Sequence, residues 1–220
     1  TVGFTTNYLF RGISQTDNEV AIQGSLDYSV DVAENLGLYA GVWGSNIDFG
    51  DEADFGGASL GTIEIDLYGG ASYAISDIAS IGGSIAYYAN PGASSSLEFD
   101  NIEFGLDGSY DFDAVSTTLN FAYSPDFFGG SGDSFYVAGG FDVPLPQNFS
   151  ISGGLGFQAI GENDTFGTPD YLEWNFGLNY EIAGFDLQAQ YADTDLSESE
   201  CFGGSNLCQS RVVFSISRSF

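Results

Sequence analysis

Histidine is missing from this sequence, and the only three basic residues are Arg11, Arg211 and Arg218, so lysine is missing too. Acyl-transfer sites generally use a histidine or a lysine as the general base, and such a site is therefore excluded. Paired carboxylates, such as Glu64 and Asp66, could do acid–base work on sugars. They share one strand face, however, which favours two wall residues over an enzyme. The net charge of −28 leaves nothing to neutralise phosphates and argues against nucleic acid.

Long apolar runs are also absent, so the sequence predicts no transmembrane helix. Cysteine occurs only twice, in the segment "CFGGSNLC" (Cys201 and Cys208). A metal site is disfavoured because neither histidine nor a second cysteine pair is available. The spacing predicts a local disulfide formed in an oxidising compartment.

Alternation of apolar and polar residues recurs along the whole chain and indicates β-strands. In the second run, for example, Leu26 and Tyr28 fall on one face, and Asp27 and Ser29 fall on the other. In the third run the apolar face stays open: it carries either Leu38 and its alternate neighbours or Tyr39 and Trp43. Twelve runs are predicted, at residues 2–13, 20–32, 36–47, 61–75, 79–89, 101–112, 115–124, 134–143, 149–160, 171–182, 185–193 and 210–220.

The connections between these runs alternate between long and short. An up-and-down meander therefore has its short turns at one end and its long loops at the other, the layout of an outer-membrane barrel. The sequence predicts one all-β domain over residues 1–220, a transmembrane antiparallel barrel of 12 strands. An even strand number places both termini at one end, which is the periplasmic end.

A soluble sandwich or lipocalin-like barrel would show the same alternation, so the positions of the charged residues are needed to distinguish a soluble from a membrane barrel. None of the 31 acidic residues falls on the apolar face of a strand. That face instead carries aromatic residues near both ends of the strands, as a bilayer selects. One girdle is predicted to include Tyr28, Tyr180 and Phe220, and the other Phe10 and Tyr191. The polar face, rich in Gly, Ser, Asn and Gln, suits a water-filled lumen.

The segments "TNYLFRGISQTD" (residues 6–17), "GSLDY", "LYAGVWGSNIDFG" and "EIDLYGG" resemble the TorF-like porin family of proteobacterial outer-membrane proteins. The resemblance covers about residues 3–70. It implies an outer-membrane β-barrel and brings no catalytic residues with it. The final Phe220, with its alternating apolar neighbours, also resembles the C-terminal signal read by the barrel assembly machinery.

Carboxylates on the polar face predict a porin-like channel through which cations diffuse passively, because rings of acids repel anions. Arg11 and Arg211 are expected near one another at the external mouth. They either create a transverse field across a constriction or act as ion-pair partners, and the sequence leaves both open. Inward Tyr68, Tyr88 and Tyr136 could narrow the lumen or stack on a sugar. The candidate pore-lining residues are Arg11, Arg211, Glu64, Asp66, Glu103, Asp107, Glu173 and Asp27.

The alternative function is a non-conducting structural or adhesive barrel of the outer membrane. Its acidic external loops, such as "DFGDEAD" and "DTDLSESE", could be bridged by Ca²⁺ or Mg²⁺, although no loop matches a known calcium motif. No other cofactor is expected. The expected partners are outer-membrane lipid, lipopolysaccharide, the barrel assembly machinery and a second copy of the chain. The expected location is the outer membrane of a Gram-negative bacterium.

Overall fold

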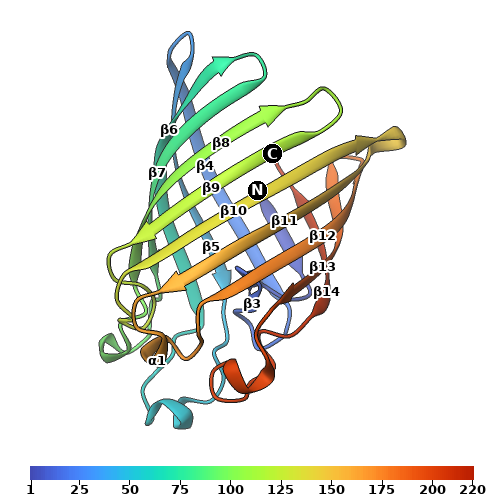
Figure 1. Cartoon of the computed structure of the whole chain (residues 1–220). Coiled ribbons are helices and arrows are strands. Elements are labelled where there is room, and N and C mark those ends of the chain that lie inside the picture. The colour runs from blue at the N-terminus through green and yellow to red at the C-terminus, as the bar shows by residue number, and fades with distance from the viewer.

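Twelve strands close into an antiparallel barrel in the computed structural model, which describes residues 1–220 (Figure 1). The predicted fold class and strand number are therefore confirmed. The barrel strands are β1 (Val2–Thr5), β4 (Ala21–Ala33), β5 (Leu36–Asn46), β6 (Ile63–Ser76), β7 (Ala79–Ala89), β8 (Asn101–Asp111), β9 (Ser116–Ser124), β10 (Ser134–Leu145), β11 (Phe149–Ile160), β12 (Tyr171–Ile182), β13 (Phe185–Thr194) and β14 (Arg211–Arg218).

The barrel closes where its first and last strands meet. Val2 of β1 is the register partner of Arg218 in β14 on one side, and Thr5 of β1 is the partner of Ala21 in β4 on the other. Every strand therefore has two neighbours in the closed sheet, although the short β1 pairs with only the Ala21–Gly24 part of β4. None of the helical segments has the length and apolar character needed to cross a bilayer.

The connections segregate by length, as the sequence predicts. The five at one end, which we call the turn side, span residues 34–35, 77–78, 112–115, 146–148 and 183–184. The six at the other end, the loop side, span residues 6–20, 47–62, 90–100, 125–133, 161–170 and 195–210. The loops carry α1 (Asn163–Phe166) and the 3-10 turns η1 (Glu52–Phe55), η2 (Ser95–Leu97) and η4 (Glu198–Glu200), whereas η3 (Pro146–Asn148) lies on the turn side.

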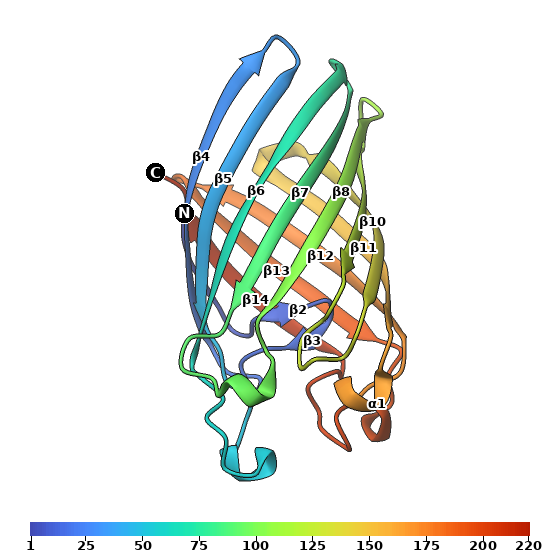
Figure 2. The ribbon, with the colours of Figure 1, turned by 90° about the vertical axis from the view of Figure 1, so that its left-hand side faces the viewer.

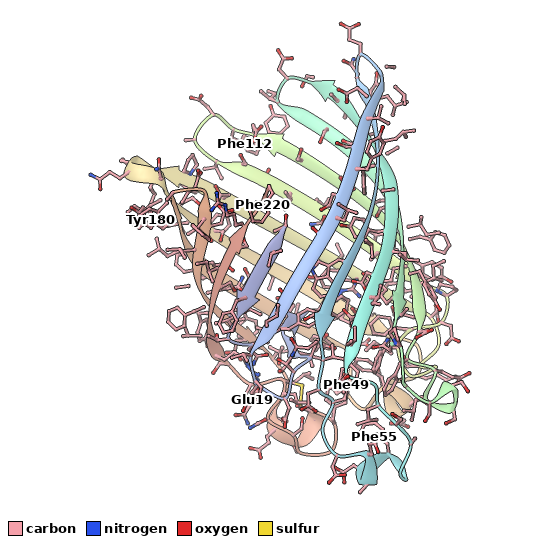
Figure 3. The ribbon with its side chains drawn as sticks, turned by 180° about the vertical axis from the view of Figure 1, so that it is seen from behind. Glu19, Phe49, Phe55, Phe112, Tyr180 and Phe220 are labelled. Atoms are coloured by element: carbon pink, nitrogen blue, oxygen red, sulfur yellow. A yellow bond between two sulfur atoms is a disulfide. The ribbon has the colours of Figure 1, made fainter.

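Both chain ends lie toward the turn side of the barrel (Figure 1). Phe112 and Tyr180 lie toward this end, whereas Phe49 and Phe55 lie among the loops at the other end (Figure 3). Both termini therefore share one end, as an even strand number requires.

The outer face of the barrel is apolar. Leu26 and Tyr28 of β4 are 74% and 69% exposed, because their side chains point away from the lumen. The open question of the third run is settled by β5, where Leu38 is exposed on the outer face and Trp43 packs against Tyr8 inside. An apolar exterior around a polar interior is the arrangement expected of a barrel in lipid.

The first predicted strand, residues 2–13, is wrong beyond Thr5. After β1 the chain leaves the wall and forms a small two-stranded sheet, β2 (Leu9–Phe10) and β3 (Ile13–Ser14). This sheet lies inside the barrel toward the loop side (Figure 2). Because Thr5 and Ala21 are register partners, residues 6–20 are a single connection that folds inward between adjacent strands.

Candidate functional site: a hairpin across the lumen

The lumen hairpin, residues 7–16, is built on a two-residue turn. Leu9 pairs with Ser14 and Phe10 with Ile13, and the turn residues Arg11 and Gly12 both have positive φ, 47° and 82°. Positive φ at both central positions is the signature of a type I′ turn. Glycine at position 12 is also required by space, since a Cβ there would lie 2.7 Å from Cγ2 of Thr194.

Arg11 at the tip of this hairpin reaches the barrel wall. Its Nη2 donates to Oε2 of Glu103 in β8 at 2.8 Å, and its Nη1 donates to Oε1 of Gln158 in β11 at 2.7 Å. The guanidinium carbon lies 4.1 Å from the ring centre of Tyr136 in β10. Arg11 and Glu103 form the only ion pair of the structure, and both side chains are at least 90% buried. The hairpin tip is therefore fixed to the wall opposite β1.

A second contact ties the hairpin to β6. The hydroxyl of Tyr8 donates to Oε1 of Glu64 at 2.7 Å, and the Tyr8 ring packs edge-on against Trp43 of β5, 5.3 Å between centroids. Burial, reinforced by the Glu64 carboxylate, raises the pKa of Tyr8 well above its usual range. The hydroxyl therefore keeps its proton and remains a donor to Glu64.

The predicted acids divide into two groups by their relation to this hairpin. Glu64 and Glu103 contact it directly, and the Cβ atom of Glu173 lies beside Gly12. Asp66 lies two residues from Glu64 on the same face of β6, is 9% exposed, and its side chain makes no hydrogen bond. The hairpin thus brings one guanidinium among several carboxylates.

The other group lies nearer the turn side and does not touch the hairpin. Asp27 accepts hydrogen bonds from Ser25 and Tyr68, and the exposed Asp107 has no hydrogen-bond partner. A cavity of about 660 Å³ opens at this end between β10 and β14. Its polar residues include Asp142, Asn179, Glu181, Asp186 and Gln188.

The hydroxyl groups of the predicted inward tyrosines donate hydrogen bonds to carboxylates of the wall. Tyr88 donates to Glu103 at 3.1 Å and Tyr136 donates to Glu173 at 2.7 Å. Both hydroxyls are therefore engaged within the wall, which favours a filling role over a free stacking surface for a sugar.

Arg211 fixes the base of the connection, residues 6–20, that carries the lumen hairpin. Its guanidinium donates to the side chain of Asn18, just after the hairpin, and to the backbone carbonyls of Asn206 and Leu207. Arg11 lies on the hairpin and not, as predicted, on the first barrel strand, and it shares no hydrogen-bond partner with Arg211. That the two guanidiniums lie near one another stays a prediction. Arg11 thus fixes the tip of the lumen hairpin, and Arg211 fixes the base of the connection that carries it.

The predicted disulfide between Cys201 and Cys208 is present, and both residues are fully buried. They belong to an apolar cluster that also contains Ile13 of the hairpin, and the backbone amide of Ser14 donates to the carbonyl of Leu207 at 3.0 Å. The disulfide loop is therefore a direct support of the hairpin.

Replacing both cysteines by serine is expected to lower the free energy of unfolding by about 2.5 kcal/mol, because the short closed loop regains chain entropy. Urea unfolding of the detergent-solubilised barrel would measure this difference. Treating the wild-type protein with a reductant should reproduce the loss, and reductant should have no effect on the serine variant. Equal stabilities of all three forms would contradict a supporting role for the disulfide.

Sequence reasoning identified the acids of this site but missed the hairpin. Residues 6–14 continue an acceptable strand alternation, and Arg-Gly is not one of the dipeptides that mark a type I′ turn. Phe10, predicted in an outer aromatic girdle, instead packs against Tyr88 inside the lumen. The one signal in the sequence was Arg11, because a positive charge on a wall strand would have required a negatively charged partner.

The acidic loops hold no preformed metal centre, since no three acidic, cysteine or histidine residues are grouped to hold a metal ion. Bridging of the loops by Ca²⁺ or Mg²⁺ stays a prediction. The loops instead meet through aromatic packing, in which Phe99 stacks on Phe128 with 4.3 Å between centroids and contacts Phe49.

A closed antiparallel barrel of twelve strands is the fold of outer-membrane porins. The family model described as "Bacterial protein of unknown function (Gcw_chp)" matches residues 1–220, and the chain belongs to this family. The finer resemblance to TorF-like porins stays a prediction. No curated protein matches the sequence.

Solved structures of outer-membrane channels are similar to the whole barrel. The KdgM porin, in complex with disordered oligogalacturonate, is 12% identical with a TM-score of 0.61, covering 100% of this chain and 98% of that one. The NanC porin is 10% identical with a TM-score of 0.63, covering 100% of both chains. An outer-membrane channel from Pseudomonas putida F1 is 13% identical with a TM-score of 0.57, covering 98% and 92%. At these identities the similarity concerns the fold.

Proposed function

We propose that this protein is a porin-like channel of the Gram-negative outer membrane that passes small cations and is narrowed at its loop side by the hairpin. The observation that carries the proposal is the charge of the interior. Eleven carboxylates lie on the polar faces of the strands, at positions 27, 31, 64, 66, 103, 107, 111, 142, 173, 181 and 186. Only Arg11 forms an ion pair with any of them.

Such an interior attracts cations and repels anions, because the carboxylates outnumber the guanidiniums in a confined space. The expected solutes therefore differ in charge from the oligogalacturonate of the KdgM complex, which is a chain of carboxylated sugars. The long loops would face outward and the termini inward to the periplasm, as in other outer-membrane barrels.

Purified protein in a planar bilayer under a KCl gradient is expected to show stepwise current with a reversal potential on the K⁺ side. Changing Asp107 and Asp142 to Asn should move the reversal potential toward zero, because two uncompensated lumen charges are removed. A matched control changes Asp51 and Asp54, both exposed in the loop that carries η1, to Asn and should leave it in place. A reversal potential on the Cl⁻ side would overturn the cation preference.

One observation favours a second candidate, a non-conducting structural barrel. The hairpin crosses the lumen and is fixed at both ends, so the loop side is obstructed. The same bilayer experiment separates the two functions, since a structural barrel gives no current steps.

A further inference from the structure

The wall around Arg11 has the features of a site for a soluble ligand, although the present occupant belongs to the same chain. Glu103 and Gln158 come from β8 and β11, and each accepts one hydrogen bond from the guanidinium. Glu103 is 5% exposed and Gln158 is 1% exposed, so both acceptors are held in place by the barrel. The ring of Tyr136, 4.1 Å from the guanidinium carbon, supplies a cation–π surface.

We propose that this wall pocket, formed by Glu103, Gln158 and Tyr136, is a binding site for a guanidino cation without a carboxylate, and that Arg11 occupies it as a tethered substitute. The inference deepens the proposed channel by naming a class of solute that it would take from the lumen. Two acceptors on neighbouring nitrogens, combined with an aromatic face, match the planar fork of a guanidinium better than a compact ammonium or metal ion. A ligand carboxylate would be repelled by the surrounding acids.

The pocket also has an acceptor that Arg11 does not use. Oε1 of Glu103 is buried without a hydrogen-bond partner. Buried polar atoms are nearly always paired, so an orphaned carboxylate oxygen requires an explanation. A second positive group on the ligand would supply the missing donor. This favours a guanidino amine, such as agmatine, over guanidinium alone.

The hairpin that carries Arg11 competes with any free ligand for the pocket. It is held by further contacts, including those of Tyr8 with Glu64 and of Ser14 with Leu207. Tethering also gives Arg11 an effective concentration on the order of millimolar. A free ligand therefore competes in the wild-type protein only at millimolar concentrations, and its binding is best seen once Arg11 is removed.

The test is chemical rescue of Arg11→Ala in detergent, measured by calorimetric titration and by the unfolding midpoint. Agmatine is expected to bind saturably and raise the midpoint, methylguanidinium to do so about tenfold more weakly, and NaCl at matched ionic strength to do neither. Adding Glu103→Gln to Arg11→Ala should abolish the rescue. Arg218→Ala is the matched control, because Arg218 stacks over Phe185 and Phe220 outside the lumen.

The site is overturned if agmatine stabilises Arg218→Ala as much as Arg11→Ala, if NaCl rescues equally, or if no binding occurs. Should Arg11→Ala fail to fold, Arg11→Gln keeps a neutral donor toward the two acceptors and is titrated in the same way. Because the readout needs no current, a barrel that binds agmatine but gives no conductance would overturn the channel and leave the site. A barrel that conducts but does not bind agmatine would overturn the site and leave the channel.

Discussion

Replacing residues 6–20 by a two-residue Asn-Gly turn is expected to raise the single-channel conductance several-fold. Thr5 and Ala21 are register partners, so two residues suffice to join β1 to β4 without altering any wall strand. The replacement removes the hairpin that crosses the lumen and leaves the carboxylates of the wall in contact with water. The open cross-section at the loop side is then limited by wall side chains alone.

The measurement is the amplitude of single current steps in a planar bilayer, compared with the wild-type protein. The matched control shortens a different loop by deleting residues 51–57, which include η1 and are exposed throughout. Its conductance should equal that of the wild-type protein, because that segment lies outside the lumen. Unchanged steps after the hairpin replacement would mean that the hairpin does not limit the current.

The same replacement should strengthen the preference for cations. It removes Arg11, the only guanidinium that pairs with a lumen carboxylate, whereas the acids lost with it, Asp17 and Glu19, are exposed on the loop side. Glu64 and Glu103 then keep their charges in a wetter environment. A reversal potential that moves toward the Cl⁻ side would contradict this account of how the lumen selects ions.

The barrel wall was predictable from the sequence because its physics is repetitive. Alternation of apolar and polar residues fixes which face meets lipid, and connection lengths fix which end carries the loops. Strands such as β11 and β12 begin and end at the residues that the pattern predicts, Phe149–Ile160 and Tyr171–Ile182. Pairing of β1 with β14 follows from closure alone, since an open edge is not tolerated in a bilayer.

The hairpin was not predictable by the same means because, apart from the charge of Arg11, its residues have the local pattern of a strand. Residues 9 and 10 and residues 13 and 14 are themselves strand-like, and only the turn at Arg11 and Gly12 reverses the chain. Arg11 adopts positive φ, which is uncommon for a residue other than glycine, and it is held there by Glu103 and Gln158 on strands far away in sequence. The sequence therefore predicts that acids such as Glu103 line the interior, but it does not predict that Arg11 pairs with Glu103, because that pair is a tertiary contact.

Removing Arg11 is expected to destabilise the barrel more than removing its partner. Arg11→Ala leaves the buried Glu103 without its cation, and breaking a buried pair in this way costs about 3–5 kcal/mol. Glu103→Gln keeps a side chain of the same shape and removes one of several mutually repelling acids. Its cost should be smaller, because Gln158 and the ring of Tyr136 still hold the guanidinium.

A double-mutant cycle makes this asymmetry measurable. Urea unfolding of Arg11→Ala, Glu103→Gln and the double variant gives three differences from the wild-type protein. We expect the double variant to be more stable than Arg11→Ala, because the change at position 103 then removes an unpaired buried charge. Arg218→Ala, outside the lumen, serves as the control and should change stability little. If the two single losses simply add, Arg11 and Glu103 do not act as a pair. If Glu103→Gln costs more than Arg11→Ala, the carboxylates around the hairpin are not an excess of negative charge that Arg11 relieves.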